Sequence, residues 1–380
     1  MRVLTLSTLF PDAERPNFGI FVERQTLGLA DAGAEVEVVS GEGVPPWPLS
    51  LHPHYGRTRR LKREEDWKGL RVHRPLFRVL PGRPAGAARA LAKAVLPLVE
   101  TLRPDVIDAE FFWPDGVAAM HLSRATGIPF SIKARGSDVH FWGGVPAVRA
   151  QLLEAAQAAH GLLAVSAALK ASMAELGMPA EKIRIHYTGI DLDLFRPAPR
   201  AAAKAALGVE GPLLVSVGAL IPLKSQRLVV EALAELPGAT LILAGDGPER
   251  GPLEQLARTR GLSGRVRFLG NRPHGELPGL LAAADVMVLP SEREGLANVW
   301  LEALACGTPL VISDVGGARE VVDRPEAGRL VPRDPAAIAA AVRELLASPP
   351  DPQNVRRTAE RFSWERNAAE LLGHLRGLVR

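Results

Sequence analysis

Residues 285–307 read DVMVLPSEREGLANVWLEALACG: a short apolar run, a polar loop, and then a second segment rich in large apolar side chains. The apolar run is continuous rather than alternating, as in a strand that is covered on both faces of a parallel sheet. The second segment is expected to be a helix. The stretch therefore predicts a strand, a loop and a helix in succession, which is the repeating unit of an α/β fold.

The same rhythm recurs along the chain, in short apolar runs bounded by glycine, proline or charge. We expect two Rossmann-like α/β units, each with a parallel sheet between helix layers. Ligands of such sheets bind at the carboxyl ends of the strands, so two facing sheets would form a cleft floored by strand-to-helix loops. The runs are MRVLTLS, EVEVVS, DVIDAE, PFSIKA, GLLAVS and KIRIHY in the first half, and PLLVSVG, ATLILAG, RVRFLG, DVMVLP, PLVISD and GRLVP in the second.

The length of 380 residues exceeds the roughly 250–300 residues that one hydrophobic core usually serves. A Pro-rich stretch followed by an alanine-rich one, residues 189–208, is expected to join two domains. We predict an N-terminal domain at residues 1–195 and a C-terminal domain at 196–360. A final helix at 361–380 is predicted to pack back toward the N-terminal domain.

The composition indicates a soluble protein of a reducing compartment. The single cysteine, Cys306, allows no intramolecular disulfide and no site of several thiolates, which fits the cytoplasm. No stretch approaches the roughly 18 consecutive apolar residues of a membrane helix. The opening MRVLTLSTLF is expected to be a first strand rather than a cleavable signal.

Positive charge is concentrated between Arg57 and Arg103, which contains thirteen Lys and Arg residues against four Asp and Glu, although the net charge of the chain is only +4. A solvated face explains this as well as an anionic partner does, either a phosphorylated acceptor or the inner face of an acidic membrane. Nucleic acid is a poorer candidate, because stacking aromatics and a recognised binding motif are absent from the sequence.

Two glutamates bracket the loop and the helix start in the opening stretch. With Glu294 in the loop and Glu302 two turns inside the helix, both carboxylates can face one cleft, with the free N–H groups of the helix N-terminus between them. Carboxylates accept hydrogen bonds from sugar hydroxyls, whereas the N–H groups suit phosphates. This arrangement favours a nucleotide sugar as ligand, although either glutamate taken alone is better explained as a solvated helix residue.

This segment, with LAGDGPER, VRFLGNRPHGELPGLLAAADV and SDVGGAREVV around it, resembles the retaining glycosyltransferases of family 4, over nearly the whole chain. The resemblance implies the GT-B fold, with an acceptor-binding N-terminal domain and a C-terminal domain that binds a nucleoside-diphosphate sugar. It also implies transfer to an acceptor hydroxyl with retention of anomeric configuration, without a bound metal or a resident cofactor. The acceptor is left open among glycans, lipid-linked sugars and small molecules.

The resemblance assigns donor contacts residue by residue. Glu294 matches the glutamate that contacts the donor sugar, Glu302 the one that holds the ribose, and Lys224 the lysine that neutralises the departing diphosphate. The N–H groups at 295–297 would meet sugar and phosphate. The donor-binding residues expected in the C-terminal domain are Gly218, Lys224, Gly245, Gly247, Glu294, Gly295, Leu296, Ala297 and Glu302.

Glycines mark two further loops. Gly245 and Gly247, in GDGPER, let the chain turn tightly after a strand. They lack the G-x-G-x-x-G spacing of a dinucleotide fingerprint, which disfavours a dehydrogenase. Gly19, in PNFGIFVERQ, resembles the family's glycine loop near the donor phosphate, although this chain lacks the paired glycines common there, and a plain turn glycine is the alternative.

The N-terminal half also departs from the family pattern. The chain reads KARGSDVH, with Arg135 where a histidine is usual, and Ala219 stands where an arginine precedes Lys224 by five residues. We hypothesise that Arg135 supplies the positive charge that Ala219 lacks; the alternative is an ion pair with Asp138 or another carboxylate.

Other side chains of this half carry weaker expectations. Trp113 and Asp115, in FFWPDGVAA, are expected either to line the acceptor cleft or, for the tryptophan, to lie in the core. His140 and His186 are acid/base candidates, although lone histidines are more often structural. No carboxylate nucleophile is identifiable, so we expect front-face substitution. A nucleotide-sugar epimerase of the same fold and a non-catalytic nucleotide-sugar-binding relative remain alternatives.

Overall fold

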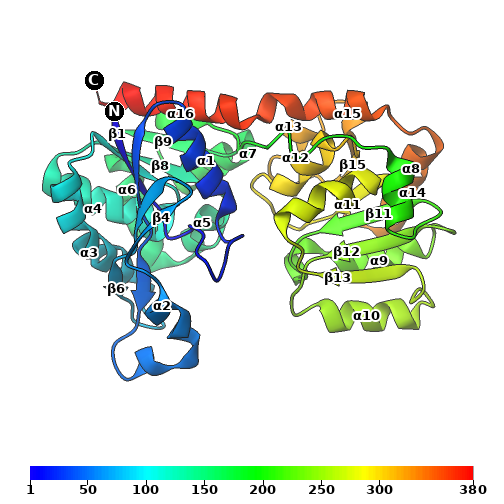
Figure 1. Ribbon diagram of the computed structural model, residues 1–380, viewed down its shortest axis with the longest axis horizontal. Coiled ribbons are helices and arrows are strands. Elements are labelled where there is room, and N and C mark those ends of the chain that lie inside the picture. Colours follow the sequence, from blue (N-terminus) through cyan, green and yellow to red (C-terminus); the bar gives the residue numbers. More distant parts are fainter. Residues whose placement is uncertain (380) are drawn as a thin grey trace. The chain divides into compact units, whose positions relative to one another are not determined.

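The computed structural model describes residues 1–379 (Figure 1). The chain folds into two units. Unit 1 comprises Met1–Gly189 and Trp364–Arg380, and unit 2 comprises Ile190–Ser363. The chain thus leaves unit 1 after Gly189 and returns to it at Trp364, whereas our sequence-based divisions lie after residues 195 and 360.

Unit 1 is built on an eight-stranded sheet in the order β10-β9-β8-β7-β1-β2-β5-β4. Its strand pairs are parallel except β4 with β5, which form an antiparallel hairpin at one edge. A separate pair joins β3 (Glu42–Val44) to β6 (Leu76–Arg78). The strands of the large sheet are β1 Arg2–Leu6, β2 Glu35–Val39, β4 Glu64–Trp67, β5 Leu70–His73, β7 Val106–Ala109, β8 Phe130–Ala134, β9 Gly161–Ala164 and β10 Ile183–Ile185.

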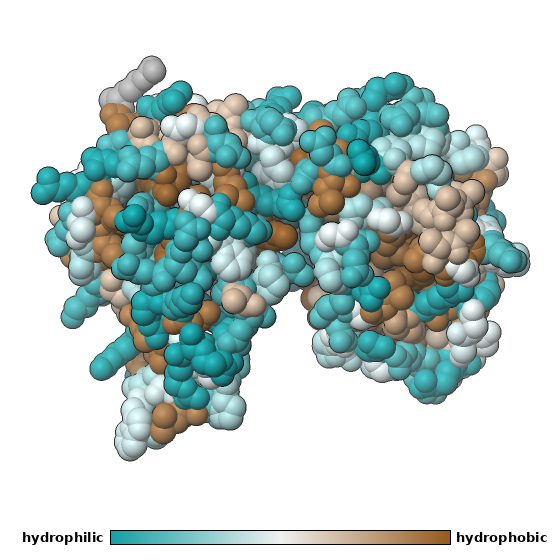
Figure 2. All heavy atoms as spheres, in the orientation of Figure 1, coloured by the Kyte–Doolittle hydropathy of each residue, from teal (hydrophilic) through white to brown (hydrophobic). Residues whose placement is uncertain are grey.

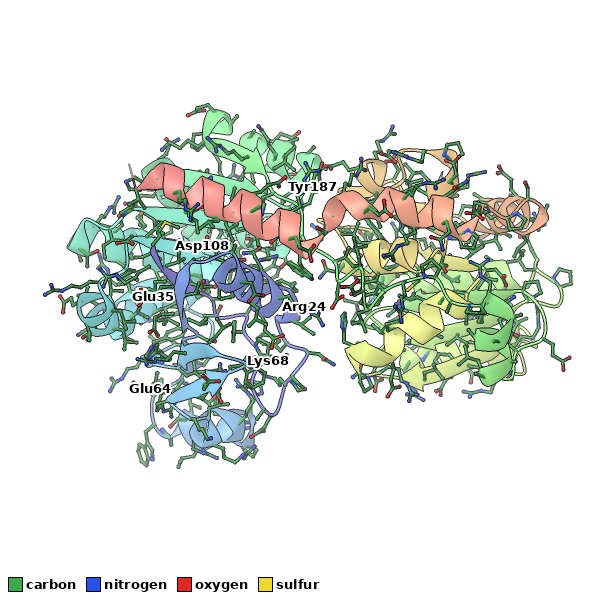
Figure 3. All side chains as sticks on the ribbon, turned by 45° about the horizontal axis from the view of Figure 1, so that its top comes forward. Arg24, Glu35, Glu64, Lys68, Asp108 and Tyr187 are labelled. Carbon is green, nitrogen blue, oxygen red and sulfur yellow. The ribbon has the colours of Figure 1, made fainter. Side chains whose placement is uncertain are left out.

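Helices cover this sheet, among them the last helix of the chain. In α16, Leu371 and Leu375 are fully buried in one cluster with Val3 and Leu29, so residues far apart in sequence share a core. Lys68, between β4 and β5, lies close to α1 in Figure 3 and pairs with Glu23 of that helix at 3.0 Å. The helices are α1 Ile20–Asp31, α2 Gly56–Arg60, α3 Ala87–Leu102, α4 Val117–Thr126, α5 Ser137–His140, α6 Pro146–Ala158, α7 Ala167–Leu176 and α16 Trp364–Leu378.

Unit 2 has a six-stranded parallel sheet in the order β13-β12-β11-β14-β15-β16. Its strands are β11 Leu213–Val217, β12 Thr240–Ala244, β13 Val266–Gly270, β14 Val286–Leu289, β15 Leu310–Ser313 and β16 Gly328–Val331. Its helices are α8 Arg200–Ala206, α9 Gln226–Leu233, α10 Arg250–Thr259, α11 Leu277–Ala283, α12 Asn298–Ala305, α13 Ala318–Val321, α14 Pro335–Ala347 and α15 Pro352–Ala359.

Local sequence explains where two of these helices begin. Asp334 accepts a hydrogen bond from the N–H of Ala337, and Asp351 accepts from Gln353 and Asn354. In each case proline is the next residue, where its fixed φ suits the first turn and its missing N–H costs nothing. An Asp-Pro pair therefore starts both α14 and α15.

The strand orders place the ligand-binding edges. In unit 2 the chain adds β12 and β13 on one side of β11 and then places β14 on the other side. In unit 1 the same reversal occurs at β1, between β2 and β7. The loops that leave such a reversal point diverge and open a crevice at the carboxyl ends of the strands. The predicted α/β class, with two Rossmann-like parallel sheets, is confirmed. Among residues 1–379, no helix is long and apolar enough to span a membrane.

Candidate functional site

Lys224 and Glu294 meet at the carboxyl edge of the unit 2 sheet. Lys224 ends the short 3-10 helix Pro222–Lys224 after β11, and Glu294 lies in the loop after β14. Lys224 Nζ lies 2.5 Å from Glu294 Oε1, and the two side chains are 20% and 11% exposed. A largely buried ion pair, still partly exposed to solvent, thus lies where the strand order of the sheet reverses.

The loop that carries Glu294 is held by backbone contacts from two neighbouring loops. The N–H of Glu292 donates to the carbonyl of Leu223 at 2.8 Å, and the N–H of Gly317 donates to Gly295 at 2.8 Å. Gly316 has φ +53°, and a Cβ there would lie 2.1 Å from the carbonyl oxygen of Glu294. The sequence VGG after β15 thus lets that loop approach closely enough to position Glu294.

Three backbone N–H groups in the loop after Glu294 have no partner in the described part of the chain. Ala297 is the residue before α12, and its methyl side chain offers no capping oxygen. Within residues 1–379, the N–H groups of Gly295, Leu296 and Ala297 donate no hydrogen bond. Free N–H groups at a helix start favour an anion. Here they follow Glu294 in the same loop, and their contact with a donor stays a prediction.

Glu302 lies inside α12 and is held by a residue that the sequence analysis did not single out. His274, in the loop after β13, places Nε2 2.8 Å from Glu302 Oε1. The ring of His274 packs edge-on against Phe195 at 5.1 Å between centroids. The only signal for this role in the sequence is a histidine in a loop that follows a parallel strand.

The glycines after β11 and β12 bring two loops into backbone contact. Gly245 has φ +146°, and a Cβ there would lie 1.9 Å from the carbonyl oxygen of Gly218. Gly247 has φ +158°, and its Cβ would lie 2.4 Å from the oxygen of Leu220. Gly218 itself has φ +149°. Glycine is required here because the loops pack without room for side chains; contact of these glycines with a donor stays a prediction.

Ala219 contributes its carbonyl oxygen, which accepts a hydrogen bond from Gln226 Nε2 at 3.1 Å. A cation that the sequence analysis missed does lie near Lys224 in the same unit. Arg333, after β16, donates to Ser225 Oγ at 3.0 Å and lies 3.9 Å from Glu292. Arg333 therefore adds positive charge beside the residue that follows Lys224.

In unit 1, Arg135 follows β8 and is engaged by a carboxylate. Its guanidinium donates to the side chain of Glu110, packs over the ring of Phe21 at 4.6 Å, and is 7% exposed. Asp138 instead accepts from the backbone N–H of Arg135 at 3.0 Å. The structure thus shows the ion-pair alternative, with Glu110 as the partner of Arg135. That Arg135 supplies the positive charge absent at Ala219 stays a prediction.

His186 belongs to the buried interior beneath Arg135. Lys133 Nζ donates to His186 Nδ1 at 2.9 Å, and His186 Nε2 donates to the carbonyl of Asn367 at 2.8 Å. Burial lowers the pKa of Lys133 to about 7 and holds the pKa of His186 well below its usual value. Burial and Glu110 raise the pKa of Asp108, labelled in Figure 3, well above its usual range. With both ring nitrogens engaged, His186 serves as a structural residue.

Gly19, Trp113 and Asp115 lie in or under the loops of unit 1. Gly19 precedes α1 with φ +69°, and a Cβ there would lie 2.3 Å from the carbonyl oxygen of Leu9. Trp113 is 3% exposed and packs on Trp142. Asp115 is fully buried, accepts from Thr8 N at 3.0 Å, and has its pKa raised by burial to about 8. Trp113 and Asp115 thus form interior structure.

Across the part of the chain that the structure describes, no cluster of three or more His, Cys, Asp or Glu is arranged to hold a metal ion.

Two family models match the chain. Residues 19–194 match the Glycosyltransferase Family 4 model, and residues 199–362 match Glycosyl transferases group 1. A Bacillus subtilis (strain 168) protein, named as a candidate teichuronic acid biosynthesis glycosyltransferase, is 29% identical over 358 residues, 90% of this chain and 88% of that one. D-inositol 3-phosphate glycosyltransferase of Mycobacterium tuberculosis (strain F11) is 38% identical over 218 residues, 53% of this chain and 45% of that one.

Solved structures of similar fold cover nearly the whole chain. Sucrose-phosphate synthase from Thermosynechococcus elongatus has a TM-score of 0.80 at 23% identity, covering 99% of this chain and 98% of that one. Anabaena HepE in complex with UDP-glucose has a TM-score of 0.75 at 22% identity, covering 99% and 100%. The two consecutive Rossmann-like units have the GT-B fold of these structures. The chain belongs to the family 4, group 1 glycosyltransferases, as its motifs predicted.

Proposed function

We propose that this glycosyltransferase moves a sugar from a nucleoside-diphosphate sugar to an acceptor hydroxyl, with retention of anomeric configuration. The observation that carries the proposal is the Lys224–Glu294 pair at 2.5 Å beside the three unpartnered N–H groups at 295–297. A cation and free N–H groups suit a diphosphate, and a carboxylate beside them suits sugar hydroxyls. One edge of one sheet thus offers complementary groups to each part of such a donor.

Each part of the donor has a partner in this scheme. Glu294 accepts hydrogen bonds from the sugar hydroxyls, while Lys224 and the N–H groups receive the diphosphate oxygens. Glu302, held by His274, accepts from the ribose hydroxyls. UDP-glucose is the first donor to test, because HepE, a structural neighbour, has been solved in complex with it.

Front-face substitution accounts for retention without a carboxylate nucleophile. The bond from the anomeric carbon to the diphosphate oxygen breaks, and the acceptor oxygen bonds to the same face of that carbon. The departing phosphate oxygen takes the acceptor's proton. Lys224 and the N–H groups stabilise the charge left on the diphosphate, an interaction that strengthens as the bond breaks and therefore accelerates the step. In this scheme that charge needs no metal ion, and the donor is a substrate rather than a cofactor.

We propose that the enzyme acts in the cytoplasm on a glycan, lipid-linked or small-molecule acceptor. The buried Cys306 and the lack of any other cysteine suit a reducing compartment. The names of two relatives, one placed in teichuronic acid biosynthesis and one acting on D-inositol 3-phosphate, supply the first acceptor classes to screen.

The test is a donor screen by thermal unfolding with UDP-glucose, UDP-N-acetylglucosamine and GDP-mannose. A donor at 100 times its Kd should stabilise the native protein by about 2.7 kcal/mol. Lys224→Met and Glu294→Gln should reduce that stabilisation, whereas Arg258→Met, at an exposed position of α10, should not. Absence of stabilisation by every nucleotide sugar would contradict the proposal.

Product analysis then separates transfer from its alternatives. With a donor and the acceptor panel, NMR of the product should show the donor's anomeric configuration, and Lys224→Met should lower kcat by about a hundredfold or more. Conversion of the donor alone into another nucleotide sugar would identify an epimerase. Donor binding without turnover on any acceptor would identify a non-catalytic binding protein.

A further inference from the structure

Residues 45–63 of unit 1, between β3 and β4, form a segment that we call the basic projection. It contains the 3-10 helices Leu49–Leu51 and Pro53–Tyr55 followed by α2, and Figure 1 shows α2 at the end of unit 1 away from β1. The segment has five Lys or Arg residues and neither Asp nor Glu. Among the Lys and Arg residues between Arg57 and Arg103, five of the thirteen therefore lie within seven positions.

Large apolar side chains are exposed in the same segment. Trp47, Leu49 and Leu51 are 77%, 54% and 59% exposed. They account for three of the eight exposed large hydrophobic residues in the described part of the chain, and they fall within five positions. Figure 2 shows apolar atoms beside hydrophilic ones at this end of unit 1. Single exposed hydrophobics are ordinary, but a cluster of this kind marks an interaction surface.

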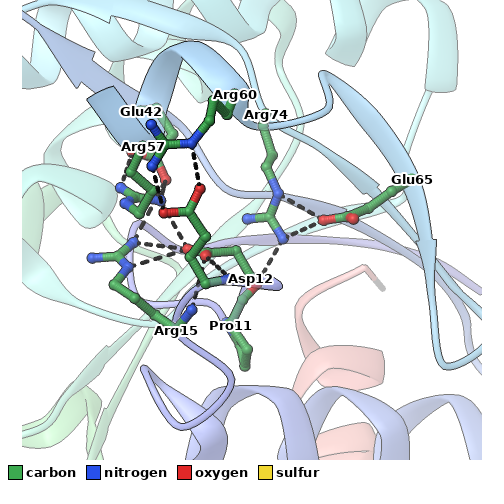
Figure 4. A network of polar contacts seen from close by, with 9 residues as sticks. Pro11, Asp12, Arg15, Glu42, Arg57, Arg60, Glu65 and Arg74 are labelled. Carbon is green, nitrogen blue, oxygen red and sulfur yellow. Dashed lines mark hydrogen bonds and ion pairs between the residues drawn. The ribbon is translucent and has the colours of Figure 1, made fainter. Parts of the chain in front are cut away.

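Two arginines hold the basic projection to the body of unit 1. Arg57 makes two hydrogen bonds with Glu42, at 3.2 and 2.7 Å, and one with Asp12 at 2.8 Å. Arg60 makes two with Glu14, at 2.9 and 2.8 Å. Figure 4 shows these contacts as one network. The carboxylates therefore neutralise Arg57 and Arg60, and the network fixes the base of the segment.

The other three cations of the basic projection have no carboxylate partner in the described part of the chain. Arg59, Lys62 and Arg63 are exposed and form no ion pair within residues 1–379. The guanidinium of Arg59 donates to the carbonyl of Ser50 at 2.9 Å, which places it on the turn that carries Leu49 and Leu51. Arg59 thus brings uncompensated positive charge to the turn with exposed apolar side chains, and Lys62 and Arg63 follow it within four positions of the sequence.

We propose that the basic projection docks this enzyme on the surface of an anionic lipid bilayer. Trp47, Leu49 and Leu51 enter the boundary between headgroups and acyl chains, where the amphipathic indole ring is favoured. Arg59, Lys62 and Arg63 contact the anionic headgroups. Stable peripheral binding needs two signals, and this segment supplies both an apolar one and a cationic one. The proposal stands independently of which donor and acceptor the enzyme uses.

The first experiment measures co-sedimentation of the full chain with phosphatidylcholine vesicles, with and without 25% phosphatidylglycerol. We expect binding to the anionic vesicles, weak binding to the neutral ones, and loss of binding as salt rises from 0.1 to 0.5 M. The variant R59Q/K62Q/R63Q should bind anionic vesicles on the order of a hundredfold more weakly. W47S/L49S/L51S should lose about tenfold or more.

Two control variants remove three cations or three exposed apolar side chains from other surfaces of the protein. K93Q/R258Q/R260Q changes exposed cations on other surfaces, and F141S/I185S/V379S changes residues that are 63%, 38% and 44% exposed. Both should bind like the unmodified protein, and all four variants should keep its melting temperature. Equal binding by the projection variants and their controls would overturn the proposal.

Tryptophan fluorescence locates the contact. Anionic vesicles should shift the emission of the unmodified protein to shorter wavelength, and Trp47→Phe should abolish most of the shift while retaining binding. A full shift in Trp47→Phe would show that another surface touches the bilayer. Concentration-dependent dimerisation that disappears in W47S/L49S/L51S, without vesicle binding, would assign the surface to a second copy of the chain and overturn the proposal.

Discussion

His274 Nε2 lies 2.8 Å from Glu302 Oε1 and so connects the loop after β13 to the middle of α12. The Glu302 side chain is 11% exposed, and Phe195 packs against the imidazole, so the ring is braced on one side. A ring nitrogen that carries hydrogen donates to the carboxylate. In the proposed function, this contact fixes Glu302 while its second oxygen remains for the ribose.

We therefore predict that His274→Ala weakens the binding of UDP-glucose by roughly tenfold to a hundredfold, since hydrogen bonds to charged groups contribute about 1.5–3 kcal/mol. Titration calorimetry measures the change. His274→Gln, which keeps an N–H donor, should recover part of the loss, and His54→Ala, at an exposed position, should bind normally. If His274→Ala bound UDP-glucose like the unmodified protein, the contact would serve packing alone.

The fold was predictable because its signal is local. Each continuous apolar run is a strand of one of the two sheets, since a strand buried on both faces admits few polar residues. The order of the strands was not predictable, because pairing depends on contacts between residues far apart in sequence. The divisions at Gly189 and Trp364 depend on the same long-range contacts, here those between α16 and the body of unit 1.

The candidate site shows the same limit at the level of single residues. Lys224 and Glu294 were identified by motif, but their contact across 70 positions depends on β11 and β14 being neighbours. The sequence did not identify Glu110 as the partner of Arg135, because Glu110 is the last residue of the run DVIDAE and its contact is long-range. The register that pairs Ala109 with Ile132 places both residues just past the ends of adjacent strands.

Gly245 tests whether the close approach of the β11 and β12 loops is required for stability. Gly245→Ala would place a methyl group 1.9 Å from the oxygen of Gly218 at φ +146°, so we predict a loss of about 3 kcal/mol or more in the free energy of unfolding. Gly251→Ala is the matched control, because it lies in α10 with open space around its Cβ and should stabilise by about 0.5–1 kcal/mol. Urea unfolding of both variants measures the difference. Equal midpoints would show that the loops can separate without cost.

Asp115 makes the stability of unit 1 depend on pH. Burial raises its pKa to about 8, above the unfolded value near 4, so the folded state binds the extra proton between these limits. Its contribution to stability is present in full below the unfolded pKa and is lost as pH rises toward 8, at up to about 1.4 kcal/mol per pH unit. Asp115→Asn, which keeps an oxygen for the Thr8 N–H, should therefore gain stability relative to the unmodified protein as pH rises. Asp31→Asn, at the exposed end of α1, is the control, and its stability should depend on pH as that of the unmodified protein does. If the stability of Asp115→Asn also changed with pH in parallel with the unmodified protein, the raised pKa of Asp115 would be contradicted.

Arg135 forms an ion pair with Glu110, and the sequence predicts that it also supplies positive charge during transfer. Paired substitutions can separate these two roles. Arg135→Ala leaves the buried carboxylate of Glu110 without its partner, which should cost about 3–5 kcal/mol of stability and lower the melting temperature. In the double variant Arg135→Met, Glu110→Gln, the buried charge is removed with its partner, so much of that stability should return. If Arg135 also supplies positive charge to the departing diphosphate, kcat of the double variant should stay at least tenfold below normal while the Kd for the donor changes less. Arg258→Met serves as the surface control. If the double variant turned over donor at the normal rate, the role of Arg135 would be limited to its ion pair with Glu110.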